Sequence, residues 1–480
     1  MSPVLLLSFV LGYFLLLFAV AAYTSRNSTN DSFFIGNRNS NWMLVAFGMI
    51  GTSLSGVTFV SVPGAIAKES FAYFQITVGY LIGYIIIAFV LLPLYYRLHL
   101  TSIYTYLNGR LGIASYKTGA SFFILSRTLG GTARLYLVVN ILQETILQSF
   151  GIPFWLTTLI ILIMILLYTY KGGVKTIVWT DTLQTTCMLA GLIICSIYIL
   201  HNLHLGFGES LHIMNDKGYS KILFTDPNSK FFFIKQIVAG AFIAITMTGM
   251  DQEMMQKNIS VKTLKDSQKN IITLAIIMLV VILLFLFLGG LLYLFAAQNN
   301  VTAIGDKLFP AIALQHMPHF IAVIFIIALI SALFPSADGA ITALTSSFCI
   351  DILGIQRRAD LTDEKKKRIR QSTHLSFAAV FLLFVLVYKW VNEPSMIGVI
   401  LKIAAYTYGP LLGLFTFGIL LKRNVHDKLV PVVCVAAPII CFLIDKYQQQ
   451  IFGSFQIGVE LLIINGTLTF IGLLLVSKKS

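Results

Sequence analysis

Charged residues are scarce in the long apolar segments of this sequence, and the few that occur there are its strongest candidates for chemistry. Asp181 lies in the motif GGVKTIVWTDTLQ, just inside an apolar segment at 176–204. An ionised carboxylate at membrane depth costs several kcal/mol unless it faces a wet cavity or a cation. Asp181 therefore predicts a cation site. The alternative is a hydrogen bond to a helix end or to Thr180 and Thr182.

Two arginines form the second candidate group. Arg134 lies near the centre of its apolar segment, and Arg127 lies seven residues earlier on the same helical face. A guanidinium is always charged and binds a carboxylate through two parallel hydrogen bonds. Arg134 therefore predicts an anionic solute. The structural alternative is an internal ion pair with one of three acidic residues, Asp251, Glu144 or Glu253.

Small and polar residues interrupt two further apolar segments, at 41–66 and 232–255. The interrupting residues are Gly48, Gly51, Ser53, Ser55, Gly56 and Thr58 in the first, and Thr246, Thr248, Gly249, Asp251 and Gln252 in the second. A broken helix at membrane depth is tolerated where it lines a cavity, because its freed backbone groups need partners other than lipid. The freed carbonyls are natural sodium ligands. Close helix packing by small residues is the alternative.

Composition places these segments in a membrane. The 480 residues are 57% hydrophobic and 11% charged, whereas soluble domains contain about 25% charged residues. The basic residues behind the net charge of +14 lie in short loops, which indicates membrane orientation and not nucleic-acid binding. No HExxH motif, nucleophile elbow or cysteine spacing for a metal is present. We therefore expect no enzyme activity, no nucleic-acid partner and no cofactor.

Thirteen apolar segments are expected to cross the membrane. A hydrocarbon core of about 30 Å takes roughly 20 helical residues. The segments lie at 3–24, 41–66, 69–96, 117–148, 153–170, 176–204, 232–255, 270–298, 319–349, 371–391, 396–421, 429–447 and 458–477. The first has no cleavage pattern and is expected to be retained.

The spacing of the interrupted segments predicts the organisation of the chain. They are five segments apart, which indicates two inverted five-helix repeats. The expected parts are a peripheral helix and loop at 1–40, the first repeat at 41–204, a loop at 205–231, the second repeat at 232–421, and two peripheral helices at 422–480.

Basic residues predict the orientation. Lys and Arg number 23 in the loops of one side, which include 25–40, 256–269 and 352–370, and seven in the loops of the other side. Cytoplasmic loops carry such an excess. We therefore expect a multi-pass protein of the cell membrane, surrounded by lipid, with its amino terminus outside and its carboxyl terminus in the cytoplasm.

Several motifs resemble those of the sodium:solute symporter family, also called solute carrier 5-like. They are FFIGNRNSNW (Phe33 to Trp42), GTSLSGVTFVSVPGA (Gly51 to Ala65), GGVKTIVWTDTLQ (Gly172 to Gln184), SALFPSADGAITALTSSFCID (Ser331 to Asp351) and YTYGPLLGL (Tyr406 to Leu414). The resemblance implies an all-α, LeuT-like fold with a 5+5 inverted repeat, about 13 transmembrane helices, and breaks in the first and sixth core helices.

The resemblance also implies cation ligands. The principal sodium site would use the carbonyls of Gly51, Leu54 and Ala332 and the hydroxyl of Ser336. Pro335 replaces the usual first serine of that motif, so one hydroxyl is missing. A second position would bring Asp181 close to Asp338. Two carboxylates in a dry site rarely both stay ionised, so a second sodium ion or a shared proton would lie there.

For the solute, the resemblance implies contacts along the broken helices and the helix that follows the first. The matching residues are Ser53, Ser55, Thr58, Tyr73, Thr77, Asp251 and Gln252, and Arg134 joins them as the candidate for an anion. Hydroxyls, an amide and an aromatic ring suit a small polar solute without choosing among sugars, amino acids, vitamins and anions.

The expected function is sodium-coupled, secondary-active symport of a small polar solute by alternating access, with sodium as the coupling ion and the only metal. A proton-coupled carrier on the same fold is the nearest alternative, favoured by the two aspartates and Pro335. A channel or a membrane sensor would be a different class. No filter motif favours a channel, and the loops are too short for a signalling domain.

Overall fold

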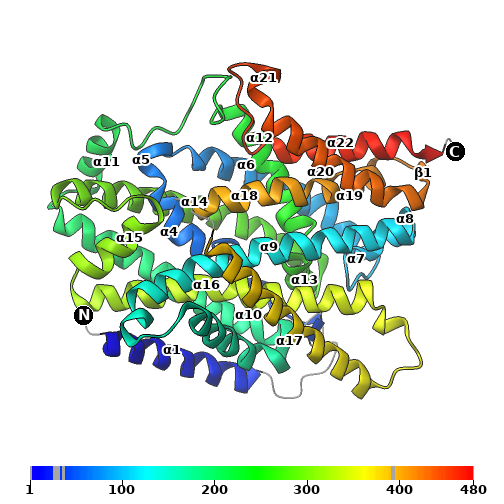
Figure 1. Cartoon of the computed structure of the whole chain (residues 1–480), viewed down its shortest axis with the longest axis horizontal. Coiled ribbons are helices and arrows are strands. Elements are labelled where there is room, and N and C mark those ends of the chain that lie inside the picture. The colour runs from blue at the N-terminus through cyan, green and yellow to red at the C-terminus, as the bar shows by residue number, and fades with distance from the viewer. Residues whose placement is uncertain (1–2, 25–32, 35–37, 391–394, 479–480) are drawn as a thin grey trace.

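The computed structural model describes residues 3–24, 33–34, 38–390 and 395–478, and of residues 170–173 and 175 it describes the backbone only. The predicted loop at 25–40 therefore lies mostly outside the described residues. The described chain is almost wholly helical (Figure 1). Its strands β1 (Asn424–Val425) and β2 (Ser477–Lys478) pair antiparallel, with Asn424 opposite Lys478.

The helices follow in an order that alternates long spans with short connecting pieces. Their bounds are α1 Pro3–Thr24, α3 Trp42–Ser53, α4 Gly56–Gly64, α5 Ile66–Glu69, α6 Tyr73–Ile86, α7 Leu92–Arg97, α8 Thr105–Arg110, α9 Ile113–Thr145, α10 Phe154–Asn202, α11 Phe207–Asp216, α12 Phe233–Ala244, α13 Gln252–Ile259, α14 Leu264–Gln298, α15 Leu308–Ala311, α16 His319–Ser347, α17 Asp363–Tyr388, α18 Met396–Thr407, α19 Gly409–Leu420, α20 Val430–Lys446, α21 Gln448–Phe452 and α22 Leu461–Leu475. Turns of π-helix, which often occur at functional sites, lie at Ile87–Leu91, Ile245–Gly249, Ile312–His316 and Phe348–Ile352.

Most of these helices are long and apolar enough to cross a membrane. Eight of the described helices meet that condition singly, and three bent pairs raise the number to 11. Two shorter apolar stretches, Phe154–Thr169 and Leu461–Leu475, correspond to the predicted fifth and last spans. The chain is therefore a multi-pass membrane protein, and the number of thirteen spans stays a prediction.

Helix α10 contains two of the predicted spans. A straight helix of its 49 residues would be about 74 Å long, far more than a hydrocarbon core of about 30 Å. The Tyr168 hydroxyl lies near the Gln184 side chain, although a straight helix would hold them about 24 Å apart. The chain therefore turns back between its apolar stretches Phe154–Thr169 and Thr176–Asn202.

The three bent pairs are the helix breaks of the molecule. Helix α3 meets α4 at 52°, and the segment Phe233–Gly249 meets α13 at 65°. These two breaks confirm the predicted interruptions. A third bend of 44° between α18 and α19 was not predicted. It lies at Gly409 and Pro410, where the proline removes a backbone donor and disfavours helical geometry in the residue before it.

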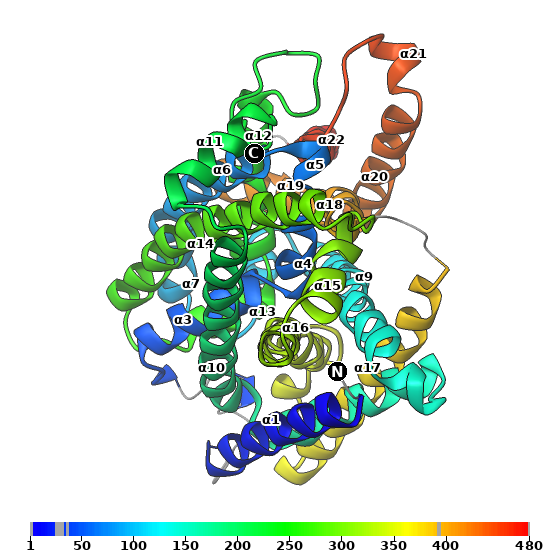
Figure 2. The ribbon, with the colours of Figure 1, turned by 90° about the vertical axis from the view of Figure 1, so that its left-hand side faces the viewer.

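Helix α16 runs through the middle of the molecule, and all its residues from Ala328 to Ser347 are buried. It packs against α3, α4, α9, α10 and α17 (Figure 2). We name the two ends of the bundle by the termini. The N face carries the start of α1 with α11 and α15, and the C face carries α8 and β1 (Figure 1). Both broken helices cross between these faces beside α16.

Candidate functional site

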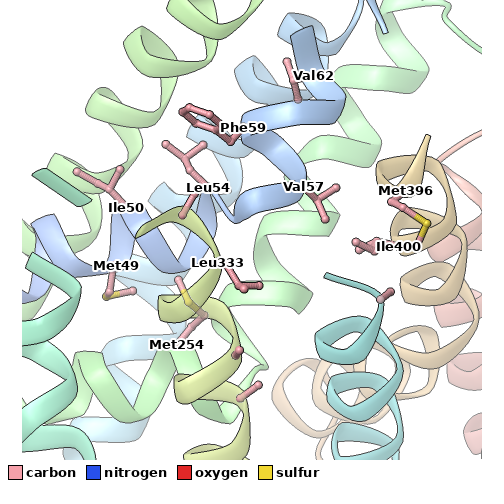
Figure 3. Close-up of a cluster of buried hydrophobic side chains, with 14 of the residues drawn as sticks. Met49, Ile50, Leu54, Val57, Phe59, Val62, Met254, Leu333, Met396 and Ile400 are labelled. Carbon is pink, nitrogen blue, oxygen red and sulfur yellow. The ribbon is translucent and has the colours of Figure 1, made fainter. Parts of the chain in front are cut away.

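The break between α3 and α4 exposes backbone groups deep inside the bundle. Asn41 caps the start of α3 by accepting a hydrogen bond of 2.9 Å from the Met43 N–H. Leu54 ends α3 with φ −92° and ψ 63°, and its N–H donates to the Ile50 carbonyl. Apolar side chains from both half-helices and Leu333 of α16 pack around the break (Figure 3). The carbonyls freed at this turn need other partners.

A cavity with about 770 Å³ of empty space, part of it open to solvent, lies beside this break. The lining comes from α3, α4, α6, α9, α12, α13, α14 and α18. Five of the predicted solute residues belong to it: Ser53, Ser55, Thr58, Tyr73 and Arg134.

Arg134 presents a charge to this cavity. Among the described residues it forms no ion pair, and it lies on the cavity wall with Tyr73, Tyr80 and Tyr84. The hydroxyls of Tyr73 and Tyr80 are 3.3 Å apart. A guanidinium beside phenol hydroxyls and apolar walls can receive an anionic group by charge-assisted hydrogen bonds.

Three predicted solute residues lie outside the cavity lining: Thr77, Asp251 and Gln252. The Thr77 hydroxyl donates to the Tyr73 carbonyl at 3.2 Å. The Gln252 amide donates to the Thr101 carbonyl at 2.9 Å and its oxygen accepts from the Ile103 N–H at 3.0 Å. Gln252 therefore joins α13 to the segment before α8.

Asp251 belongs to a contact between α9, α13 and α19. It caps α13 by accepting from the Met254 N–H at 3.2 Å, and its other oxygen accepts from the Tyr408 hydroxyl at 2.5 Å. Arg127 Nη1 lies 3.9 Å from the same oxygen, and Arg127 Nη2 pairs with Glu253. Two of the three acids considered as partners of Arg134, Asp251 and Glu253, thus pair with Arg127.

These contacts continue into a buried chain of ion pairs. Lys257 Nζ lies 3.9 Å from Glu253 Oε1 and 2.7 Å from Asp181 Oδ2. Asp181, Lys257, Glu253, Arg127 and Asp251 therefore alternate in charge, and their side chains are at most 5% exposed. We call this series the ion-pair chain. It joins α10, α13 and α9, and Arg127 also reaches the cavity.

The sequence analysis did not identify Lys257 as a site residue, because it predicted a loop at 256–269. The structure corrects that prediction, because helix α13 extends to Ile259 and Lys257 is 2% exposed. The spacing of Glu253 and Lys257, four residues apart after the helix cap Asp251, is the signal for an ion pair on a helix.

Asp338 lies on α16 near Asp181 but has a different partner. It accepts a hydrogen bond of 2.7 Å from the Tyr168 hydroxyl. The nearest partner of Asp181 is Lys257, and the Thr52 hydroxyl lies 3.3 Å from the same Asp181 oxygen. The two aspartates thus lie in one buried region, with an ammonium group on Asp181.

Helices α3 and α16, which carry the predicted sodium residues, contact each other beside the α3–α4 break. A Cβ placed on Gly51 would lie 3.4 Å from Pro335 Cγ and would collide with the Thr185 hydroxyl. The Ser336 hydroxyl donates to the Leu333 carbonyl at 2.8 Å, which leaves its lone pairs available. The Thr185 hydroxyl is buried without a hydrogen-bond partner among the described residues. It lies one turn after Asp181 and was not predicted.

The model of the sodium:solute symporter family matches residues 33–427. The "Sodium/sialic acid symporter SiaT" of Proteus mirabilis is 24% identical, over 95% of this chain and 93% of that protein. The "Sodium-coupled monocarboxylate transporter 1" of Mus musculus is 25% identical, over 82% of this chain and 64% of that protein.

Two solved structures share the fold. A substrate-bound, outward-open "Na+-coupled sialic acid symporter" has a TM-score of 0.84, with 20% identity and 99% of both chains covered. Mhp1, a nucleobase-cation-symport-1 family transporter, has a TM-score of 0.57, with 13% identity over 94% of this chain and 95% of that chain. The fold is therefore that of LeuT-like transporters, with two broken helices beside a central cavity.

Proposed function

Because the chain belongs to the sodium:solute symporter family, we propose that it imports an anionic solute with sodium and binds that solute in the cavity beside the α3–α4 break. The observation that carries this proposal is Arg134, a guanidinium on the cavity wall that has no ion-pair partner among the described residues. A charge left unpaired in a semi-enclosed site is costly, so an incoming anion gains affinity by neutralising it.

The relatives support an anion. They are named for sialic acid, monocarboxylates and iodide, which are acids or anions. Arg134 offers a fork that suits a carboxylate, and Ser53, Ser55 and Thr58 line the cavity with it. The hydroxyls and the three tyrosines suit a polar body attached to that carboxylate.

Sodium is the coupling ion, and we propose that it binds at the α3–α4 break. Gly51 and Leu54 would supply carbonyls from α3, and Ala332 and Ser336 would supply oxygens from α16. The Thr185 hydroxyl lies at the same place and would replace the hydroxyl that Pro335 lacks. All of these ligands are neutral, so the ion can bind and leave without abandoning a buried carboxylate.

The orientation and the repeats complete the proposal. We place the N face outside the cell, because the basic loops predict a cytoplasmic C face. A membrane-impermeant thiol reagent should then label a cysteine introduced at exposed Lys221 and not one introduced at exposed Lys365.

We assign the two five-helix repeats to 41–204 and 232–421, each of which begins with one of the two predicted breaks. Rocking of one repeat against the other would open the cavity to either side.

A thermal-shift screen of the purified protein tests the function. Sialic acid, short monocarboxylates, iodide and neutral sugars are each added with sodium, and then with potassium in its place at fixed pH. A true substrate should raise the melting temperature more with sodium, because ligands that bind the native state stabilise it and coupling is reciprocal. Stabilisation by neutral sugars alone would disprove the role of Arg134. Equal shifts in potassium would disprove sodium coupling.

A further inference from the structure

Lys257 lies where a second cation was predicted. Its Nζ donates to Asp181 Oδ2 at 2.7 Å and to the Thr52 hydroxyl at 2.6 Å. Its third neighbour is Glu253 Oε1 at 3.9 Å. Asp181 is fully buried and Lys257 is 2% exposed. The ammonium therefore donates two hydrogen bonds and lies within ion-pair distance of a third oxygen.

An ammonium and a sodium ion carry the same unit charge, and either can neutralise a buried carboxylate. A bound ion must be supplied from solution in every transport cycle. The ammonium of Lys257 is tethered to α13 and is present at any sodium concentration. With Lys257 in place, Asp181 needs no ion from solution.

The packing around this group suits a permanent occupant. Helix α16 passes the ion pairs at Gly339, where an added Cβ would collide with Glu253 Oε1 and would lie 3.2 Å from Lys257 Nζ. Thr52 belongs to the last turn of α3, next to the helix break, and also lines the cavity. The ammonium thus connects α3, α10 and α13, the elements that an ion at this position would hold together.

We propose that Lys257 is a built-in cation that occupies the second cation position, so that no second sodium ion binds between Asp181 and Asp338. This inference rests on the proposed sodium-coupled function and specifies its stoichiometry. One sodium ion, bound at the α3–α4 break, is then coupled to the solute. The dependence of uptake on sodium is hyperbolic, with a Hill coefficient of about one.

Binding of radioactive sodium to the purified full-length protein tests the proposal. Lys257→Met removes the ammonium and retains an unbranched side chain. This variant should bind one more sodium ion per molecule than the wild type, and its Hill coefficient should rise from about one toward two. Lys262→Met is the matched control, because Lys262 is exposed just beyond α13. It should bind the wild-type number, and an unchanged number in Lys257→Met would overturn the proposal.

Two further variants keep the test decisive if Lys257→Met folds poorly. Asp181→Asn retains the lysine and should bind the wild-type number of sodium ions. Loss of one ion in this variant would show that Asp181 holds sodium, contrary to the proposal. The double variant Lys257→Met with Asp181→Asn has neither charge and should also return to the wild-type number. A wild type that binds no sodium would disprove the proposed function, whereas the difference between wild type and Lys257→Met would still decide the role of the lysine.

Discussion

Arg127 and Arg134 lie two helical turns apart on α9, and their surroundings are opposite. Arg127 is 4% exposed and pairs with Asp251 and Glu253 in the ion-pair chain. Arg134 lies on the cavity wall and has no ion pair among the described residues. The same type of side chain forms internal ion pairs at Arg127 and lines the cavity at Arg134. The difference lies in whether a second helix supplies the counter-charge.

The ion-pair chain and the cavity therefore have different roles. The ion-pair chain joins α9, α10 and α13 through charges that satisfy one another. The cavity retains an unsatisfied charge that a ligand can satisfy. Breaking the chain should therefore affect stability first, whereas changing the cavity should affect binding first.

The largest effect is expected for Glu253→Gln, which breaks the ion-pair chain at its centre. Arg127 and Lys257 both lose a counter-charge while they stay buried. Removal of one partner from a buried ion pair typically costs about 3–5 kcal/mol. Unfolding of the protein in detergent by heat or by denaturant should show this loss of stability.

The matched control for Glu253→Gln is Glu144→Gln. Glu144 is an exposed carboxylate on α9 that accepts a hydrogen bond of 3.0 Å from Asn140. This change should alter stability by less than about 0.5 kcal/mol. Equal stability losses in the two variants would contradict the distinction between the two regions.

The next effect is expected for Arg134→Gln, measured as solute affinity. A hydrogen bond to a charged group contributes about 1.5–3 kcal/mol, so the dissociation constant of the anionic solute should rise roughly 10–100-fold. The stability of the protein without solute should not fall, because Arg134 has no ion-pair partner to lose among the described residues. Titration calorimetry of the best anion from the thermal-shift screen measures the affinity.

Arg127→Gln is the variant that separates the two roles on α9. It should lower stability in the absence of solute, as Glu253→Gln does, because it leaves Asp251 and Glu253 without their guanidinium. If Arg134→Gln lowers stability as much as Arg127→Gln and leaves solute affinity unchanged, Arg134 is a structural residue.

The fold and the class of protein could be predicted from the sequence because they depend on local and repeated signals. Apolar segments, interrupted helices and motifs predicted a LeuT-like sodium:solute symporter, and the family match and the shared fold confirm it. The breaks in 41–66 and 232–255 were visible as clusters of small polar residues. The bend at Gly409 and Pro410 was missed, because we took the apolar run 396–421 as one straight span.

The pairing of charges could not be predicted in the same way. Arg127 and Arg134 have similar apolar neighbours in the sequence, and they differ because the chain brings Asp251 and Glu253 to Arg127 only. Lys257 reads as one more basic residue near a loop until helix α13 carries it beside Asp181. Contacts between distant helices depend on tertiary geometry, which the residue spacing of one segment does not contain.

A smaller effect is expected at the neutral oxygens beside the break. Thr185→Val removes the unpartnered hydroxyl next to Gly51 and retains the shape of the side chain. If this hydroxyl contacts sodium, its loss costs about 1.5 kcal/mol, so half-maximal uptake should require roughly tenfold more sodium. Exposed Thr186 on the same helix gives the matched variant Thr186→Val, which should leave sodium affinity unchanged. Equal sodium affinity in the wild type and Thr185→Val would exclude this hydroxyl as a ligand.

The smallest effect concerns a buried carboxyl with no charged partner among the described residues. Asp306 lies in the connection between α14 and α15, and burial raises its pKa to about 6 although it accepts a hydrogen bond of 2.9 Å from the Met396 N–H. A carboxyl with a higher pKa in the folded state binds its proton more tightly there than in the unfolded chain. Its contribution to stability is therefore fully present below about pH 4 and is lost as the pH rises through about 6.

Asp306→Asn should remove this pH dependence. Between pH 7.5 and pH 5 the wild type should gain about 1 kcal/mol from protonation of Asp306, and the variant should lack that gain. Melting temperatures in detergent across this range measure the difference between the two slopes, so titration of other groups cancels. Asp226→Asn changes an exposed carboxyl of the segment between α11 and α12 and should keep the wild-type slope. The carboxylates of the ion-pair chain are neutralised by cations, whereas Asp306 is neutralised by binding a proton. Equal slopes of melting temperature against pH in the wild type and Asp306→Asn would remove that contrast.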